Sequence, residues 1–179
     1  MLFTLTPGKG TVALEVSYHF LALAKHGVTS ISNELSCPIP PARIFKAAVL
    51  DAHNLLPKIL PDKIKSIEVQ GSGGAGSIKQ INLAEDGPFA FIKHRIEELD
   101  EANFTVKFSL IEGAVIGEKI EKVVNIVQFV ASADGGSIIK VTSEFYTMGE
   151  DELQMGKEMA TGTFKMVEGY LLENPTAYA

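Results

Sequence analysis

The chain has 179 residues, of which 46% are hydrophobic and 21% are charged, and this composition fits one globular domain with a sizeable core. The formal net charge is −6 and no cluster of Lys and Arg offsets it, so the sequence excludes a general attraction to nucleic acid. The one cysteine, Cys37, excludes an intramolecular disulfide framework and suits a reducing compartment. No apolar run reaches the ~18 residues of a membrane span. We therefore expect a cytoplasmic protein, with the nucleus as a second location and no membrane partner.

The first 26 residues differ in character from the rest of the chain. Their apolar stretch ends in small residues, as a signal peptide does, but Glu15 and His19 interrupt it and only Lys9 is basic before it. We therefore divide the chain into an extension of uncertain status at 1–26 and a domain at 27–179, and we do not expect secretion.

The domain begins with a strand and two short helices. Residues 28–35 are polar and β-branched, and the three prolines after them predict an edge strand. Pro41 suits the first turn of a helix, and the apolar spacing after it predicts helices over 41–50 and 51–59 with a bend between them.

A glycine-rich stretch separates two further predicted strands, 65–70 and 77–83. Its spacing matches G-x-G-x-x-G, but a dinucleotide site requires a helix next, and residues 77–83 alternate like a strand. A phosphate-binding P-loop also fails, because no Lys-Ser/Thr pair comes after the last glycine. We interpret the stretch as a hairpin turn, with anion binding by its backbone N–H groups as the alternative. Its glycines are Gly71, Gly73, Gly74 and Gly76.

Four more strands and a long helix complete the pattern. Alternating residues and tight turns predict strands at 89–98, 104–112, 119–132 and 137–146. Residues 151–173 carry two neighbouring apolar stripes at helical spacing, one through Phe164, Val167 and Leu171 and one through Met159, Met166 and Tyr170. The sum predicts an α+β helix-grip fold: a seven-stranded curved antiparallel sheet wrapped around a long C-terminal helix, with two short helices after the first strand.

This order of elements, with several motifs, resembles the major birch-pollen allergen family, the class-ten pathogenesis-related proteins of plants. The resemblance covers 27–178 and rests on the motifs PPARIFKA at 40–47, the glycine stretch at 71–76, SLIEG at 109–113, IEK at 120–122, DGGSI at 134–138, KEM at 157–159 and EGYL at 168–171. Three departures are that Gln70 replaces an acidic residue, that the segment from Gly149 to Lys157 is short, which predicts a wider mouth, and that the extension before Gly27 has no counterpart in the family. The resemblance implies a monomeric plant defence protein whose internal cavity binds small amphipathic molecules such as flavonoids, cytokinins and brassinosteroids. We expect no cofactor and no metal.

The strand alternation predicts which side chains line that cavity. The apolar candidates from the strands are Ile81, Leu83, Phe89, Phe91, Val106, Phe108, Val127, Ile139, Val141 and Phe145. The candidates from the last helix are Met159, Gly162, Thr163 and Met166. Asn125 and Ser143 share the inward parity, and His94 is a further candidate for a hydrogen-bonding anchor. For each polar residue the alternative is a satisfied group in an ordinary core, and the resemblance favours cavity lining for the set.

Two alternative functions come from the same resemblance. The residues proposed for ribonuclease activity in the family correspond to Lys79, Glu121, Glu168 and Tyr170, which could act as acid and base on RNA. A hormone sensor that binds abscisic acid and inhibits a protein phosphatase would need two gate loops. The loops at 83–89 and 112–118 lack the gate sequences of such receptors.

Overall fold

The computed structural model describes residues 27–85, 89–113, 116, 120–147 and 155–179, with the backbone alone for 147 and 155–161. Seven antiparallel strands form one sheet in the order β1-β7-β6-β5-β4-β3-β2, so the first strand lies at an edge. The strands are β1 (Val28–Cys37), β2 (Ile64–Gln70), β3 (Ile78–Leu83), β4 (Phe91–Asp100), β5 (Thr105–Gly113), β6 (Ile120–Ala131) and β7 (Ser137–Thr147).

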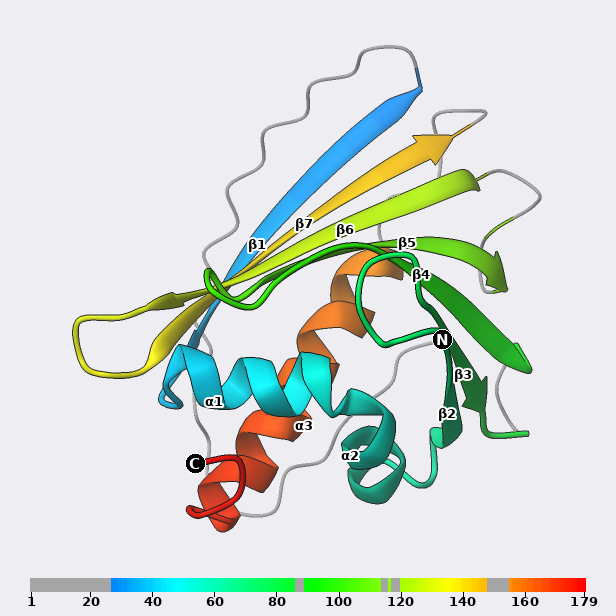
Figure 1. Ribbon diagram of the computed structural model, residues 1–179. Helices are drawn as coiled ribbons and strands as arrows, with labels where there is room; N and C mark the ends of the chain where they lie inside the picture. Colours follow the sequence, from blue (N-terminus) through cyan, green and yellow to red (C-terminus); the bar gives the residue numbers. More distant parts are fainter. Residues whose placement is uncertain (1–26, 86–88, 114–115, 117–119, 148–154) are drawn as a thin grey trace.

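The helices lie on the concave side of this sheet. They are α1 (Pro41–Phe45), a π-helical segment η1 (Lys46–Leu50), α2 (Ala52–Ile59) and α3 (Met155–Glu173). In Figure 1 the sheet curves around α3, and α1 and α2 lie beside it. The predicted helix-grip fold is therefore confirmed, with strand ends that differ by one or two residues from expectation.

The helical region after β1 contains one feature that the sequence pattern did not show. The predicted first helix changes from α to π geometry at Lys46, and the predicted bend lies at Asp51, whose φ is −106° and ψ 15°. Pro57 lies within the last turn of α2, which runs on to Ile59. The predicted start of the long helix at 151 and the extension at 1–26 lie outside the described residues.

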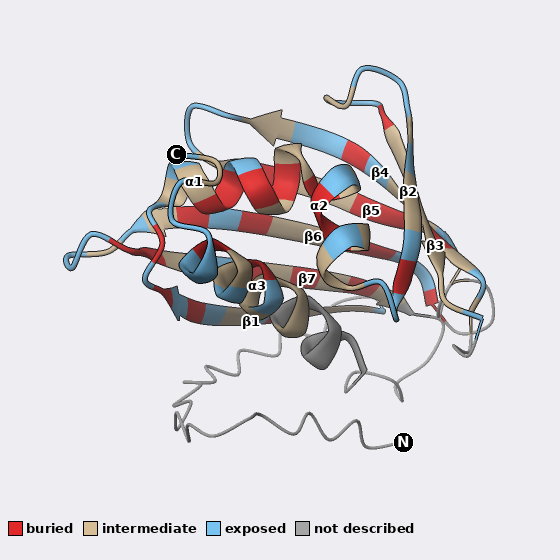
Figure 2. Cartoon of the chain, turned by 90° about the horizontal axis from the view of Figure 1, so that it is seen from below, coloured by how far each residue is buried: buried red, intermediate tan, exposed pale blue. Residues whose placement is uncertain are grey.

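One end of the molecule is packed solidly, and we call it the closed end. There Phe129 of β6 meets the rings of Phe45 and Phe164 edge-on, with centroids 5.6 and 5.7 Å apart. Val167 and Leu171 of α3 are fully buried against the same cluster. Figure 2 shows buried positions, coloured red, on α1, on α3 and on the strands of the sheet. Burying such large side chains is the dominant stabilising term of the fold.

Polar contacts hold the end of α3 in place. The guanidinium of Arg43 in α1 donates to the carbonyls of Leu171, Asn174 and Ala177 at 2.6 to 3.0 Å. These are carbonyls at or beyond the helix end, where intrahelical donors run out and a cation is favourable. The Tyr178 hydroxyl donates to the carboxylate of Asp51. The C-terminus of the helix is therefore fixed to the junction of η1 and α2.

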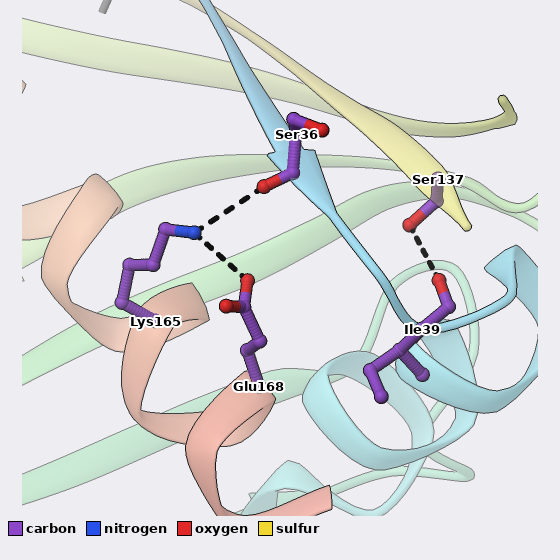
Figure 3. A network of polar contacts seen from close by, with 5 residues as sticks. All are labelled: Ser36, Ile39, Ser137, Lys165 and Glu168. Atoms are coloured by element: carbon purple, nitrogen blue, oxygen red, sulfur yellow. Dashed lines mark hydrogen bonds and ion pairs between the residues drawn. The ribbon is translucent and has the colours of Figure 1, made fainter. Parts of the chain in front are cut away.

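A second set of polar contacts joins α3 to the end of β1 (Figure 3). Lys165 donates to the carbonyl of Ser36 and pairs with Glu168 at 2.9 Å. The buried hydroxyl of Ser137 donates to the carbonyl of Ile39. Cys37 lies beside this network and is 1% exposed. Burial raises the pKa of its thiol, and the nearby charge of Glu168 adds to the effect.

Candidate functional site

A row of polar side chains crosses the inner face of the sheet. In an antiparallel sheet, directly paired residues point to the same face. Asn125 of β6 pairs with Ser143 of β7 on one side and with Phe108 of β5 on the other. His94 of β4 pairs with Lys79 of β3, while Asn33 of β1 pairs with Val141, next to Ser143. We define the polar row, in the order of the strands, as Asn33, Ser143, Asn125, His94 and Lys79.

The polar row separates two apolar clusters on the same face. On the side of the closed end, the neighbouring strands β1, β7, β6, β5 and β4 each contribute one buried residue. In that order these residues are Leu35, Ile139, Val127, Val106 and Ile96. On the opposite side, the same strands contribute a second set: Ile31, Phe145, Val123, Leu110 and Ile92. Small-molecule sites in proteins are mostly apolar surfaces with a few placed polar groups, and this face has that arrangement.

His94 and Phe108 form the aromatic part of the row. Their ring centroids lie 4.9 Å apart with the planes tilted by 32°. The His94 ring keeps some accessible surface, yet its surroundings strongly disfavour the charged imidazolium. Desolvation, followed by the charge of Lys79, lowers its pKa from 6.5 to about 4. His94 is therefore a neutral imidazole at pH 7, able both to donate and to accept a hydrogen bond.

Lys79 is the one cation in the polar row. Its ammonium donates to the carbonyl of Val49 in η1 at 2.9 Å, close to the bend at Asp51. Desolvation lowers its pKa below the usual value for lysine. Within the described residues, no carboxylate lies in ion-pair contact with this ammonium.

Amides and a hydroxyl make up the other half of the row. The Ser143 hydroxyl donates to the side-chain oxygen of Asn125 at 2.7 Å. The side-chain oxygen of Asn33 is buried and has no hydrogen-bond partner. Sequence reasoning did not identify Asn33, although the alternation of Ile31, Asn33 and Leu35 along β1 contained the signal.

The structure places most of the predicted lining residues on the inner face, with two degrees of burial. Five apolar ones are buried in the two clusters: Val106, Val127, Ile139, Val141 and Phe145. Three others remain half-buried: Ile81, Leu83 and Phe108. Phe89 precedes β4 and is half-buried, and the Met159 side chain lies outside the described atoms.

Two predicted directions are wrong. Phe91 lies on the outer face, because β4 begins at that residue and Ile92 is the one that turns inward; the Lys93 ammonium lies 5.2 Å from the Phe91 ring. Met166 is 40% exposed, since α3 buries the neighbouring stripe through Val167 and Leu171. Thr163 and Gly162 are half-buried, and a Cβ on Gly162 would meet nothing within 4 Å.

The four residues considered for ribonuclease activity lie apart. Lys79 is on β3 and Glu121 is exposed at an irregularity of β6, three strands away. Glu168 pairs with Lys165 beside β1, while Tyr170 packs under the ammonium of Lys58 in α2. Positions two apart on a helix do not share a face, so Glu168 and Tyr170 point in different directions. These groups do not form one acid-base site.

The glycine stretch serves its own conformation. Gly71, Gly73 and Gly76 have positive φ angles of 107°, 90° and 85°. The amide of Gly73 donates to the Ser77 hydroxyl, and that of Gly76 donates to the carbonyl of Ile96 in β4. The amide of Gly74 donates to the Ser72 hydroxyl. Because these N–H groups already have acceptors within the turn and the sheet, the structure favours the hairpin-turn interpretation over anion binding.

Other classes of site receive no support from the described part of the chain. Within it, no group of three or more His, Cys, Asp or Glu is placed to hold a metal ion. None of its helices combines the length and apolarity needed to span a bilayer. Half of the two loops considered as hormone gates, residues 86–88, 114–115 and 117–118, falls outside the described residues.

Comparison with known proteins identifies the family. The model of the pathogenesis-related protein Bet v 1 family matches residues 26–174. The chain belongs to this family. The major strawberry allergen Fra a 1.08 of Fragaria ananassa is 49% identical over 158 residues, which cover 85% of this chain and 99% of the relative. The major allergen Pru ar 1 of Prunus armeniaca is 43% identical with the same coverage.

Solved structures of other proteins share the fold. The crystal structure of Ara h 8.0201 has a TM-score of 0.73 and 39% identity, and the match covers 82% of this chain and 99% of that one. Norcoclaurine synthase of Thalictrum flavum, in complex with dopamine and hydroxybenzaldehyde, has a TM-score of 0.67 at 19% identity, with coverage of 87% and 97%. At that identity the second likeness concerns the fold alone.

Proposed function

We propose that this Bet v 1 family protein binds small amphipathic molecules between α3 and the inner face of the sheet. The observation that carries the proposal is the polar row, which is set between two apolar clusters and whose members other than the buried Ser143 are half-buried. A core built only for stability gains nothing from a partnerless amide oxygen such as that of Asn33, because an unpaired buried polar atom costs free energy.

The chemistry of the row indicates a ligand with a ring system and polar ends. The Phe108 and His94 rings offer a flat surface for an aromatic or fused-ring body. From Lys79 to Asn125 the row spans three strand spacings, or roughly 14 Å before curvature is considered. Flavonoids, cytokinins and brassinosteroids are of this size and character, and the synthase of the same fold was solved with two aromatic molecules.

The proposal includes the biological setting of the family, a cytoplasmic plant protein connected with defence. The single cysteine, buried and reduced at the end of β1, is compatible with the reducing cytoplasm. The dispersal of Lys79, Glu121, Glu168 and Tyr170 gives ribonuclease activity no support. No described contact favours a phosphatase partner.

A fluorescence titration with the neutral apolar dye N-phenylnaphthylamine tests the proposal. We expect saturable binding with displacement by quercetin, a flavonoid, and by zeatin, a cytokinin. Phe108→Ala, on the inner face, should weaken dye binding at least about tenfold, because an aromatic contact worth ~1.5 kcal/mol or more is lost. Phe91→Ala is the matched control, since it removes a half-buried phenylalanine from the outer face of the adjacent strand. Absence of saturable binding, or equal effects of the two substitutions, would overturn the proposal.

A further inference from the structure

Among the side chains that the structure describes, Lys79 is a cation without a countercharge inside the proposed ligand site. It lies on the inner face of β3, where its directly paired neighbour on β4 is His94. Of the groups around it, His94 is neutral at pH 7 and Val49 contributes a carbonyl oxygen. An ammonium removed from water and left without a carboxylate loses solvation that a neutral carbonyl replaces only in part.

The surface lysines of the same sheet show the contrast. Lys93, one position before His94 on β4, points to the outer face and pairs with Glu112 at 2.5 Å. Lys65 of β2 pairs with Glu85, and Lys140 of β7 with Glu34. On the outer face, then, lysines of β2, β4 and β7 have acid partners, while the lysine that faces inward has a carbonyl.

We infer that the ligands preferred by this site are amphipathic anions, whose carboxylate, sulfonate or phenolate group binds Lys79 while a ring system lies on Phe108 and His94. This inference rests on the proposed function and specifies its ligand class. An anion would complete the hydrogen-bonding and charge requirements of the ammonium, and charge-assisted hydrogen bonds of this kind are about twice as strong as neutral ones.

The position of Lys79 makes it accessible to such a group. Its side chain keeps part of its surface exposed, and an ammonium has three donors, of which one reaches Val49. An anion can therefore bind while the contact with η1 is kept. His94, as a neutral imidazole, offers a second donor to the same anion and brings no opposing charge.

Two fluorescent dyes that differ by one sulfonate test the inference. Anilinonaphthalene sulfonate is the anionic counterpart of N-phenylnaphthylamine, so their affinities for one protein separate the effect of charge from that of the rings. We expect Lys79→Met, which keeps an apolar stem, to weaken binding of the sulfonate dye at least about tenfold and that of the neutral dye less than about twofold. Lys79→Arg should retain most of the affinity for the sulfonate, because it retains the charge.

The control is Lys93→Met, which removes a lysine from the outer face of the neighbouring strand and should leave both dyes unaffected. Equal weakening of the two dyes by Lys79→Met, or no weakening of the sulfonate, would refute the inference and leave the proposed function intact. If neither dye binds the wild-type protein saturably, the proposed function itself fails.

A competition experiment on the wild-type protein gives the same answer without any substitution. Naphthaleneacetic acid and naphthaleneacetamide share a ring system and differ in charge at pH 7. We expect the acid to displace the neutral dye at a concentration at least about tenfold lower than the amide requires. Equal potency of the two compounds, or greater potency of the amide, would contradict a preference for anions.

Discussion

The closed end and the polar row occupy the same face of the same sheet, but their side chains differ in how far they are buried and in whether their polar atoms have partners. At the closed end, Phe45, Phe129 and the α3 residue Leu171 are buried in one cluster, and the rings of Phe45 and Phe129 meet edge-on. Along the polar row, His94 and Asn125 keep accessible surface, and the Asn33 oxygen has no partner. The closed end is therefore packed for stability, whereas the polar row between the two apolar clusters retains groups that cost stability and that the proposed binding would use.

The largest expected effect comes from breaking the closed end. Phe129→Ala should lower the free energy of unfolding by about 3 to 5 kcal/mol, because a ring that is 2% exposed is replaced by a cavity. Phe108→Ala, in the polar row, should cost less than half as much, since that ring is only half-buried. Urea denaturation of both variants measures the difference, and equal losses would show that the row is as tightly packed as the closed end.

The pH dependence of stability tests the environment of His94. Its pKa is about 4 in the folded protein and near 6.5 when unfolded, so between these values the unfolded chain binds more protons. The stability contributed by the neutral ring is therefore present above pH 6.5 and lost as pH falls toward 4, by up to about 3 kcal/mol.

His94→Gln should remove this part of the pH dependence. The comparison is the slope of unfolding free energy against pH, measured for both proteins between pH 6.5 and 4. A wild-type slope in His94→Gln would mean that the His94 ring titrates normally in the folded state.

Removing the guanidinium that holds α3 should have a smaller effect. Arg43→Met leaves the carbonyls of Leu171, Asn174 and Ala177 without their charged donor, and we expect a loss of about 2 kcal/mol. The melting temperature of this variant can be compared with that of Arg95→Met, which removes an exposed arginine from β4. A similar stability for the two variants would show that Arg43 does not fix the helix end.

The smallest expected effect has the opposite sign. Asn33→Leu replaces a side chain whose buried oxygen lacks a partner, so we expect a gain in stability of about 1 kcal/mol together with weaker dye binding. Asn82→Leu, on β3, should instead destabilise, because its amide donates to Ser66 and Glu68 at 2.8 and 2.9 Å. Thermal melts and dye titrations of both variants would decide this, and a destabilised Asn33→Leu would contradict the proposed trade of stability for binding.

The fold was predictable from the sequence because its signals are local. Alternation identified the seven strands, and the prolines and the DGG turn separated them. The π geometry of η1 was not predictable, because it has no distinct residue pattern and depends on how the short helices pack.

The site was predictable in part. Strand alternation placed Asn125, Ser143 and Phe108 on one face, but it failed at Phe91, where the register depends on where β4 begins. It could not decide which of two adjoining apolar stripes α3 buries, since both Met166 and Val167 fit a core and only packing against β6 and α1 distinguishes them. The partners of Lys79 depend on η1, thirty residues earlier in the chain, and no local pattern encodes such a contact.

The position of Cys37 gives the protein a built-in reporter of its own motions. Because this thiol is the chain's sole cysteine and is covered at the meeting point of β1, β7 and α3, an alkylating reagent can reach it only when that junction separates. The rate of modification by a maleimide in native buffer therefore measures how often this junction opens, and its change on adding a ligand would show whether binding at the polar row restrains that opening.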